Sequence, residues 1–259
     1  MSTMADNEMV RFLRYAEHEV TPVEGALVRE APLTIFVNGQ ELVTLLCTPS
    51  KLNCLVVGFL YLEGILQGVD EISLLRLCDE EQTAEVRLSG EFHLSDRPRV
   101  LTSGCGGGTT FTIPGSIPGV DSELRMGPEQ LTMLMKSLLT QAGAYKETGG
   151  IHTSALGDGR KLDIIAEDVG RHNTIDKIVG ECLLSGISCK DRVLLTTGRI
   201  SSEMLMKAAR VGVPIVASRS SPTDLAVRLA DELNVTIVGY LRGGKMNIYT
   251  HAWRIVISA

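Results

Sequence analysis

Residues 192–217, RVLLTTGRISSEMLMKAARVGVPIVA, decide the expected fold of this chain. Residues 192–196 form an apolar strand-like run, residues 202–211 repeat apolar side chains at helical spacing, and residues 214–217 form a second strand-like run. The same alternation extends to both sides, with predicted strands at 151–155, 163–166, 235–238 and 246–250 and predicted helices at 173–184 and 222–233. Strands that alternate with helices predict a largely parallel sheet with helices on both faces.

Polar side chains gather where these strands give way to helices. The three corners read EDVGRHN at 167–173, TTGRISS at 196–202 and SRSSPT at 218–223. Ligands of open α/β sheets bind at the carboxyl ends of the strands, and helix N-termini attract phosphate. The corners therefore predict a site for a pyrophosphate or a nucleotide. Any single corner is also explained by helix capping alone, as the pair Ser221 (N-cap) and Pro222 (first helical residue) illustrates.

A further turn, GYLRGGK at residues 239–245, joins the last two predicted strands. It offers an aromatic face and two cations, which suit stacking on a base and binding of phosphate. The alternative is a basic β-turn without a ligand. The histidines beside these motifs, His152 and His172, receive no chemical role by themselves, because most single histidines are structural.

The first half of the chain predicts a smaller α+β unit. Strand-like runs at 34–37 and 41–46 flank an Asn-Gly turn, which predicts a hairpin. A helix is predicted at 52–66, strands at 72–77, 83–88 and 91–94, a short strand within residues 1–30, and, after a Gly/Pro-rich connector, a helix at 128–148. The resulting domains are an α+β domain at 1–101, a mobile loop at 102–125 and a larger α/β domain at 126–259.

The connector contains TSGCGGGTT at residues 102–110, with Cys105 among four glycines. Glycines leave this thiol flexible and accessible, whereas most cysteines are small buried hydrophobic residues. The alternative is a glycine-rich linker in which the cysteine is incidental. The other five cysteines lie in or beside apolar segments, where we expect core or near-core positions: Cys47, Cys54, Cys78, Cys182 and Cys189.

Composition excludes several classes of protein. The formal net charge of −6 argues against non-specific binding of nucleic acid. No apolar run approaches the length of a membrane span, and the start MSTMADNEMVRF has no signal-peptide pattern. We therefore expect a cytosolic protein with reduced thiols. No CxxC pair is present, so the usual ligand spacing of a structural zinc site is missing.

Several co-linear motifs resemble the formate dehydrogenase accessory sulfurtransferase family, FdhD. They are EAPLTIFVNG, VVGFLYLEGIL, TSGCG, TGGIHTSAL, EDVGRHNTIDKIVG, TTGRISSEMLMKAARVGVPIVASRSSPTDLAVRLA and VGYLRGGKMNIYTH. The resemblance covers residues 30–255 and implies a three-layer α/β/α, cytidine-deaminase-like fold for the second domain.

The resemblance also implies a function, a site and partners. A cysteine desulfurase would load Cys105 with a persulfide, and the sulfur would pass to the molybdenum of a bis(molybdopterin guanine dinucleotide) cofactor destined for formate dehydrogenase. Family members are generally homodimers. The cofactor-binding stretch falls on Tyr240, Leu241, Arg242, Gly243, Gly244 and Lys245, together with His172, Arg199 and Ser218.

One position departs from the family pattern. Many members carry a second cysteine where this chain has Gly108, so a single thiol must carry the sulfur here. A cofactor-binding chaperone without sulfur transfer is the main alternative. A zinc-dependent hydrolase is disfavoured, because His152-Thr153-Ser154 lacks the glutamate that such chemistry requires.

Overall fold

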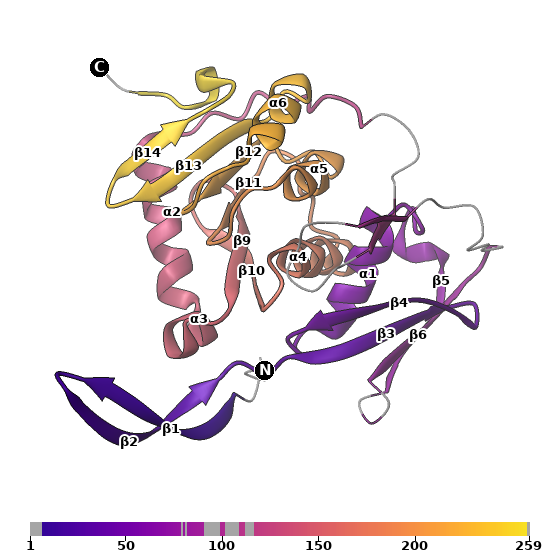
Figure 1. Cartoon of the computed structure of the whole chain (residues 1–259). Coiled ribbons are helices and arrows are strands. Elements are labelled where there is room, and N and C mark those ends of the chain that lie inside the picture. Colours follow the sequence, from indigo (N-terminus) through magenta and orange to yellow (C-terminus); the bar gives the residue numbers. More distant parts are fainter. Residues whose placement is uncertain are drawn as a thin grey trace.

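The structure, a computed structural model, describes residues 7–78, 80, 82–90, 99–101, 109–111 and 117–257. Its centre is a six-stranded sheet with the strand order β10-β9-β11-β12-β13-β14 (Figure 1). The strands are β9 (His152–Gly157), β10 (Leu162–Asp168), β11 (Val193–Thr196), β12 (Ile215–Ser218), β13 (Thr236–Arg242) and β14 (Lys245–Ile248). All six lie where the sequence predicts strands.

The expectation of a largely parallel sheet is wrong, because only the pairs β11–β12 and β12–β13 are parallel. The pairs β9–β10, β9–β11 and β13–β14 are antiparallel. A parallel connection requires a long crossover, usually a helix. Short turns instead join β9 to β10 and β13 to β14, so these strands must reverse direction.

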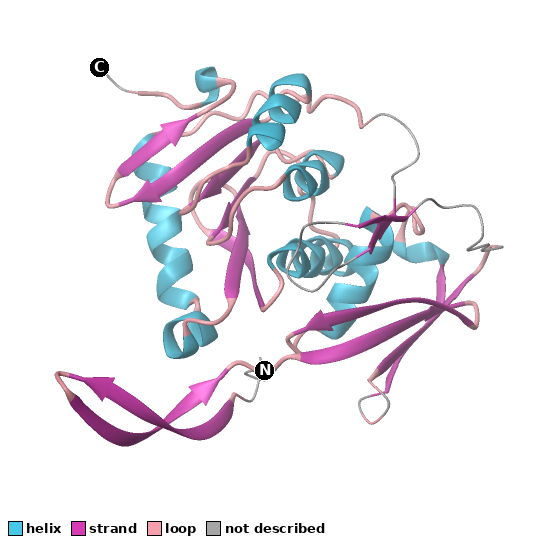
Figure 2. Cartoon of the chain, in the orientation of Figure 1, coloured by secondary structure: helices cyan, strands magenta, loops and turns pink. Residues whose placement is uncertain are grey.

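Helices cover both faces of this sheet (Figures 1 and 2). On one face, Leu156, Leu194 and Val216 pack in a single core cluster with residues of α4, α5 and α6. On the other face, Ala155, Leu195 and Ala217 pack against α2. The alternation follows from the two-residue period of a strand. The helices are α2 (Pro128–Gln141), α4 (Arg171–Ser185), α5 (Ser202–Arg210) and α6 (Asp224–Glu232).

Two predictions about helices of the larger domain are wrong. The helix predicted at 128–148 is broken at Ala142 into α2 and α3 (Gly143–Thr148). The break frees the first N–H groups of α3, and those of Ala144 and Tyr145 donate to the carboxylate of Glu167. The N-cap of α6 is Thr223 rather than Ser221, since its hydroxyl accepts from the Ala226 N–H.

The N-terminal part contains a second sheet with the strand order β4-β3-β6-β5. The predicted hairpin is confirmed as β3 (Ala31–Val37) and β4 (Gln40–Cys47), and the predicted helix is α1 (Leu52–Leu62), four residues shorter than expected. The other strands are β5 (Ile72–Cys78) and β6 (Thr83–Leu88). Helix α1 is buried on nearly every side, because it lies between this sheet and α4.

Residues 1–30 hold more structure than the single short strand that the sequence predicts. Strands β1 (Glu8–Ala16) and β2 (Glu19–Leu27) form an antiparallel hairpin that extends beside the rest of the chain (Figure 1). A two-residue turn at Glu17 and His18, both with positive φ, joins them.

The predicted loop at 102–125 lies partly outside the described residues, as does the predicted strand at 91–94. The short strands β7 (Arg99–Leu101) and β8 (Thr109–Phe111) pair antiparallel and flank residues 102–108. At the other end of the predicted loop, Val120 is buried and its N–H donates to the Leu233 carbonyl. Residues 117–125 are thus anchored to the larger domain at Val120.

Helices α1 and α4 approach each other closely at two glycines. A Cβ atom on Gly180 would lie 1.9 Å from the Cys54 carbonyl oxygen, and one on Gly58 would lie 1.8 Å from the Asp176 carbonyl oxygen. Both obstacles are helix backbone and cannot rotate away. The crossing that joins the two parts of the chain therefore requires glycine at both positions.

We expect Gly180→Ala to lower the free energy of unfolding by about 1–3 kcal/mol, because the two helices must move apart to admit the methyl group. Chemical denaturation followed by circular dichroism measures this loss. Gly143→Ala is the matched control, since a Cβ at that helical position meets no described atom within 4 Å apart from its own helix and chain neighbours. Equal stability of the two variants would contradict the packing argument.

Candidate functional site

The predicted polar corners do come together at one edge of the central sheet. Strands β10, β11, β12 and β13 run in the same direction, so their carboxyl ends meet there. Backbone hydrogen bonds then connect the corners: the Arg219 N–H donates to the Thr196 carbonyl, and the Tyr240 N–H donates to the Ser220 carbonyl. This edge is the candidate ligand site.

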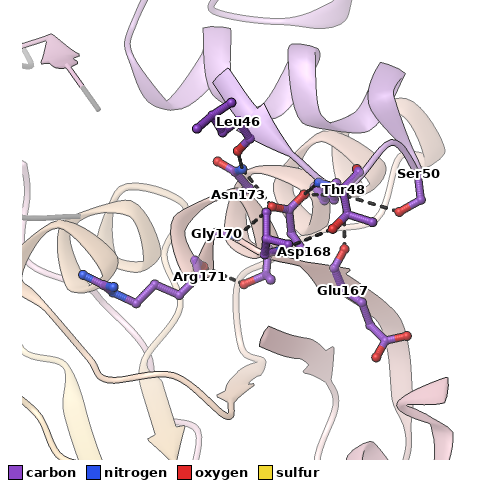
Figure 3. Close-up of polar contacts among 11 residues, drawn as sticks. Leu46, Thr48, Ser50, Glu167, Asp168, Gly170, Arg171 and Asn173 are labelled. Carbon is purple, nitrogen blue, oxygen red and sulfur yellow. Dashed lines mark hydrogen bonds and ion pairs between the residues drawn. The ribbon is translucent and has the colours of Figure 1, made fainter. Parts of the chain in front are cut away.

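The first corner, however, is mainly a joint between the two parts of the chain (Figure 3). The carboxylate of Asp168 accepts from the backbone N–H groups of Thr48 and Gly170 and from the Asn173 side chain. It also forms an ion pair of 2.6 Å with Lys177, and both side chains are fully buried. Thr48 belongs to the N-terminal part, so this network fixes that part against α4.

Lys177 completes the joint. Its Nζ atom donates to the Thr48 carbonyl at 3.0 Å and to the Glu167 carbonyl at 3.1 Å. The Asn173 side chain donates to the Leu46 carbonyl at 2.9 Å, which adds a second tie to β4. This role is not visible in the sequence, where Asp168 and Lys177 are only two opposite charges nine residues apart.

Arg171 is the member of this corner that points away from the joint, as Figure 3 shows. Its side chain lies against Gly198 of the second corner: a Cβ atom on Gly198 would lie 3.1 Å from the Arg171 Cβ and 3.3 Å from the His152 Nδ1. Arg171 is only 7% exposed, and its Nε has no hydrogen-bond partner among the described residues. A buried guanidinium with an unsatisfied donor is suited to binding an anion.

Both histidines near Arg171 are held neutral. Burial, together with the charge of Lys207, lowers the pKa of His172 to about 3. Burial and the charge of Arg171 also lower the pKa of His152. The His172 Nε2 lies 3.1 Å from the Ser201 hydroxyl, which caps α5. His172 therefore positions the start of that helix.

The remaining residues predicted in the corners divide into exposed and buried groups. Arg199 is exposed on the loop between β11 and α5. Ser218 is fully buried, and its hydroxyl donates to the Gly198 carbonyl at 2.6 Å and accepts from the Ser220 N–H. The buried Ser218 hydroxyl thus holds the backbone of the second corner against that of the third.

The predicted binding turn follows β13 at the same edge. The Tyr240 side chain is 46% exposed, whereas Leu241 faces the core. The Arg242 Nε donates to the Arg219 carbonyl at 2.7 Å, which ties the turn to the third corner. Gly243 and Gly244 both have positive φ and form the turn itself, and the exposed Lys245 follows them.

Cys105 lies outside the described residues, between β7 and β8. Of the other five cysteines, four are buried as predicted, whereas Cys78 is half-buried. Burial raises the pKa of Cys47 to about 12 and also raises the pKa of Cys54. Thiols of this kind are poor nucleophiles, because the thiolate is the reactive form.

A cavity of about 200 Å³ lies on the N-terminal sheet, between Arg29, Cys47, Cys78 and Gln82. The raised pKa keeps the Cys47 thiol protonated there.

Within the described residues, no group of three or more His, Cys, Asp or Glu side chains is placed to hold a metal ion. In the same residues, no helix is long and apolar enough to cross a membrane.

These features define a two-part α/β protein with a cationic edge on its larger sheet and a cysteine-bearing glycine segment between β7 and β8. The model of the FdhD/NarQ family matches residues 28–256, nearly the whole chain. The chain therefore belongs to the FdhD/NarQ family.

Individual relatives agree with this assignment. A Bacillus subtilis protein named "Sulfur carrier protein FdhD" is 41% identical over 248 residues, which cover 93% of this chain and 95% of that protein. A Staphylococcus aureus protein of the same name is 39% identical over 254 residues, or 95% of each chain. The crystal structure of a formate dehydrogenase accessory protein from Desulfotalea psychrophila superposes with a TM-score of 0.80 at 25% identity, covering 96% of this chain and 99% of that one.

Proposed function

We propose that this chain is a cytoplasmic sulfur carrier that serves formate dehydrogenase. It accepts sulfane sulfur from a cysteine desulfurase as a persulfide on Cys105. It then passes this sulfur to the molybdenum of a bis(molybdopterin guanine dinucleotide) cofactor, which is the substrate. The observation that carries the proposal is the near full-length similarity to proteins named sulfur carriers.

Loading requires only thiol chemistry at Cys105. Its thiolate attacks the terminal sulfur of a cysteine persulfide on the donor, the S–S bond of that persulfide breaks, and the donor leaves as a thiolate. Cys105 then holds the sulfur as a persulfide. Delivery would break the S–S bond of the Cys105 persulfide and return Cys105 to its thiolate, and the acceptor metal or an added reductant would supply the two electrons that take the outer sulfur to sulfide.

The acceptor is held at the cationic edge of the central sheet, in a domain that we propose to be of the cytidine-deaminase type. We assign the Arg171 guanidinium to the nucleotide phosphates, because its side chain lies beside Gly198 at this edge and its Nε has no hydrogen-bond partner within the described part of the chain. Arg199 and Lys245 add exposed cations, and the ring of Tyr240 offers a stacking surface for guanine. Binding at this edge holds the acceptor in place, so that the sulfur passes from the Cys105 persulfide to a positioned acceptor.

We expect Arg171→Gln to weaken the binding of GDP, used as a fragment of the acceptor, by about 1.5–3 kcal/mol. The variant loses a charged hydrogen bond to phosphate in a buried setting. Isothermal titration calorimetry measures the affinity. Arg160→Gln is the control, because Arg160 lies in the turn between β9 and β10, at the opposite edge of the sheet. Unchanged GDP binding by Arg171→Gln would remove this residue from the site.

The function is tested by incubating the wild-type chain with a cysteine desulfurase and cysteine, followed by mass spectrometry of its peptides. We expect the peptide that contains Cys105 to gain one sulfur atom.

The second candidate is a chaperone that binds the cofactor without transferring sulfur, and it is favoured by Gly108 in place of a second thiol. GDP binding without sulfur loading, in a chain that still supports formate dehydrogenase maturation, would select the chaperone.

We further propose that the chain acts as a homodimer, as the family resemblance implies. Its two copies would each carry one Cys105 thiol.

A further inference from the structure

Among the described residues, one face of the N-terminal hairpin carries large apolar side chains that nothing covers. Residues that pair directly across the strands share a face. One face, here called the outer face, consists of Met9, Arg11, Leu13 and Tyr15 from β1 and Val20, Pro22, Glu24 and Ala26 from β2. The opposite face holds the half-buried Val10, Val23 and Gly25 and the exposed Phe12 and Leu27.

The outer face is apolar and exposed. The exposed fractions are 57% for Met9, 72% for Leu13, 67% for Tyr15 and 59% for Val20. Scattered exposed apolar residues are common on proteins, but a contiguous set on one face marks an interaction surface. A lone two-stranded hairpin is also only marginally stable in water, and this one pairs with no third strand among the described residues.

The charges on the outer face indicate what covers it. Arg11 pairs directly with Glu24, between the apolar pairs Met9–Ala26 and Leu13–Pro22. A second copy can pack its outer face against this one about a two-fold axis that lies between the two faces and runs parallel to the strands. Strand β1 of each copy then lies over β2 of the other, and Arg11 of each copy faces Glu24 of the other. The charges of the face are therefore complementary to those of a second copy.

We propose that the outer face of the β1–β2 hairpin docks against the same face of a second copy of this chain. The inference names the surface of the homodimer proposed above and does not depend on the sulfur chemistry. Apolar pairs supply the contact area, and the two reciprocal Arg11–Glu24 pairs fix the orientation of the two copies.

The test is a charge-reversal experiment read by analytical ultracentrifugation over a dilution series. Arg11→Glu alone and Glu24→Arg alone each place like charges opposite one another in the dimer. We expect each single variant to raise the dimer dissociation constant by at least about tenfold. In an equimolar mixture of the two variants every cross-copy pair is opposite in charge, so dimers should form again as a one-to-one mixed species.

The mixture separates docking from effects inside one hairpin, because each variant chain keeps its own like-charged cross-strand pair. Circular dichroism verifies that both variants remain folded. Thr21→Glu, on the opposite face, is the matched control and should leave the dissociation constant unchanged. If neither single substitution changes the dissociation constant of the dimer, the outer face is not the docking surface. The proposed homodimer would then still hold. A monomeric wild-type chain would overturn both, and sulfur loading of Cys105 would then be judged separately.

Discussion

Lys177→Met should lower the free energy of unfolding by about 3–5 kcal/mol, because it leaves the Asp168 carboxylate buried without its counter-ion. Both side chains are fully buried, and their atoms lie 2.6 Å apart. The carbonyl groups of Thr48 and Glu167 lose their shared donor in the same step. Urea denaturation followed by circular dichroism gives the free energy.

The control for this prediction is Lys161→Met, the same substitution at an exposed lysine. The Lys161 side chain is 73% exposed and lies 3.7 Å from Asp163, so its loss should change stability by less than about 0.5 kcal/mol. The double variant Lys177→Met/Asp168→Asn removes the unpaired charge and should recover part of the lost stability. A Lys177→Met chain as stable as the wild type would show that the joint does not hold the two parts of the chain together.

Cys105→Ser should abolish sulfur loading completely while leaving GDP affinity unchanged. A serine hydroxyl is not ionised near neutral pH and cannot hold a persulfide, whereas a thiolate can. Gly108 offers no second thiol within the motif to take over the role. The measurement is peptide mass spectrometry after incubation with a desulfurase and cysteine, together with a maturation assay for formate dehydrogenase.

Cys78→Ser is the control for the loading experiment. Cys78 is the only half-buried cysteine among the five that the structure describes, so it is the strongest competitor for the label. We expect its variant to load sulfur on Cys105 as the wild type does. Label on Cys78 or on a buried cysteine in the Cys105→Ser chain would refute the assignment, and loss of folding in that chain would return Cys105 to a structural role.

Much of the local structure could be read from the chain. Apolar periodicity located the six strands of the central sheet and its helices, and the Asn38-Gly39 turn located the β3–β4 hairpin. The polar corners could also be assigned to one edge, because strands connected through helices run in the same direction. These properties depend on residues close together in sequence, so local patterns are sufficient to predict them.

The sequence did not reveal how residues far apart would use their polar groups. The family resemblance places Ser218 and His172 in the cofactor-binding set, and in the structure their side chains also hydrogen bond to the Gly198 carbonyl and the Ser201 hydroxyl. Asp168 belongs to the first predicted corner, yet together with Lys177 it holds Thr48 against α4. Whether a polar side chain serves a ligand or the fold depends on which partners reach it, and a linear pattern does not contain that information.

The sequence by itself determined the element types, the edge where the corners meet and the isolation of Cys105 among glycines, since these follow from periodicity, connection length and composition. Only the tertiary structure decided the antiparallel direction of β9 and the break at Ala142, where the Glu167 carboxylate satisfies the N–H groups of α3. It also decided the glycine contact between α1 and α4. Each of these results from groups far apart in the chain competing for the same space or the same hydrogen bond.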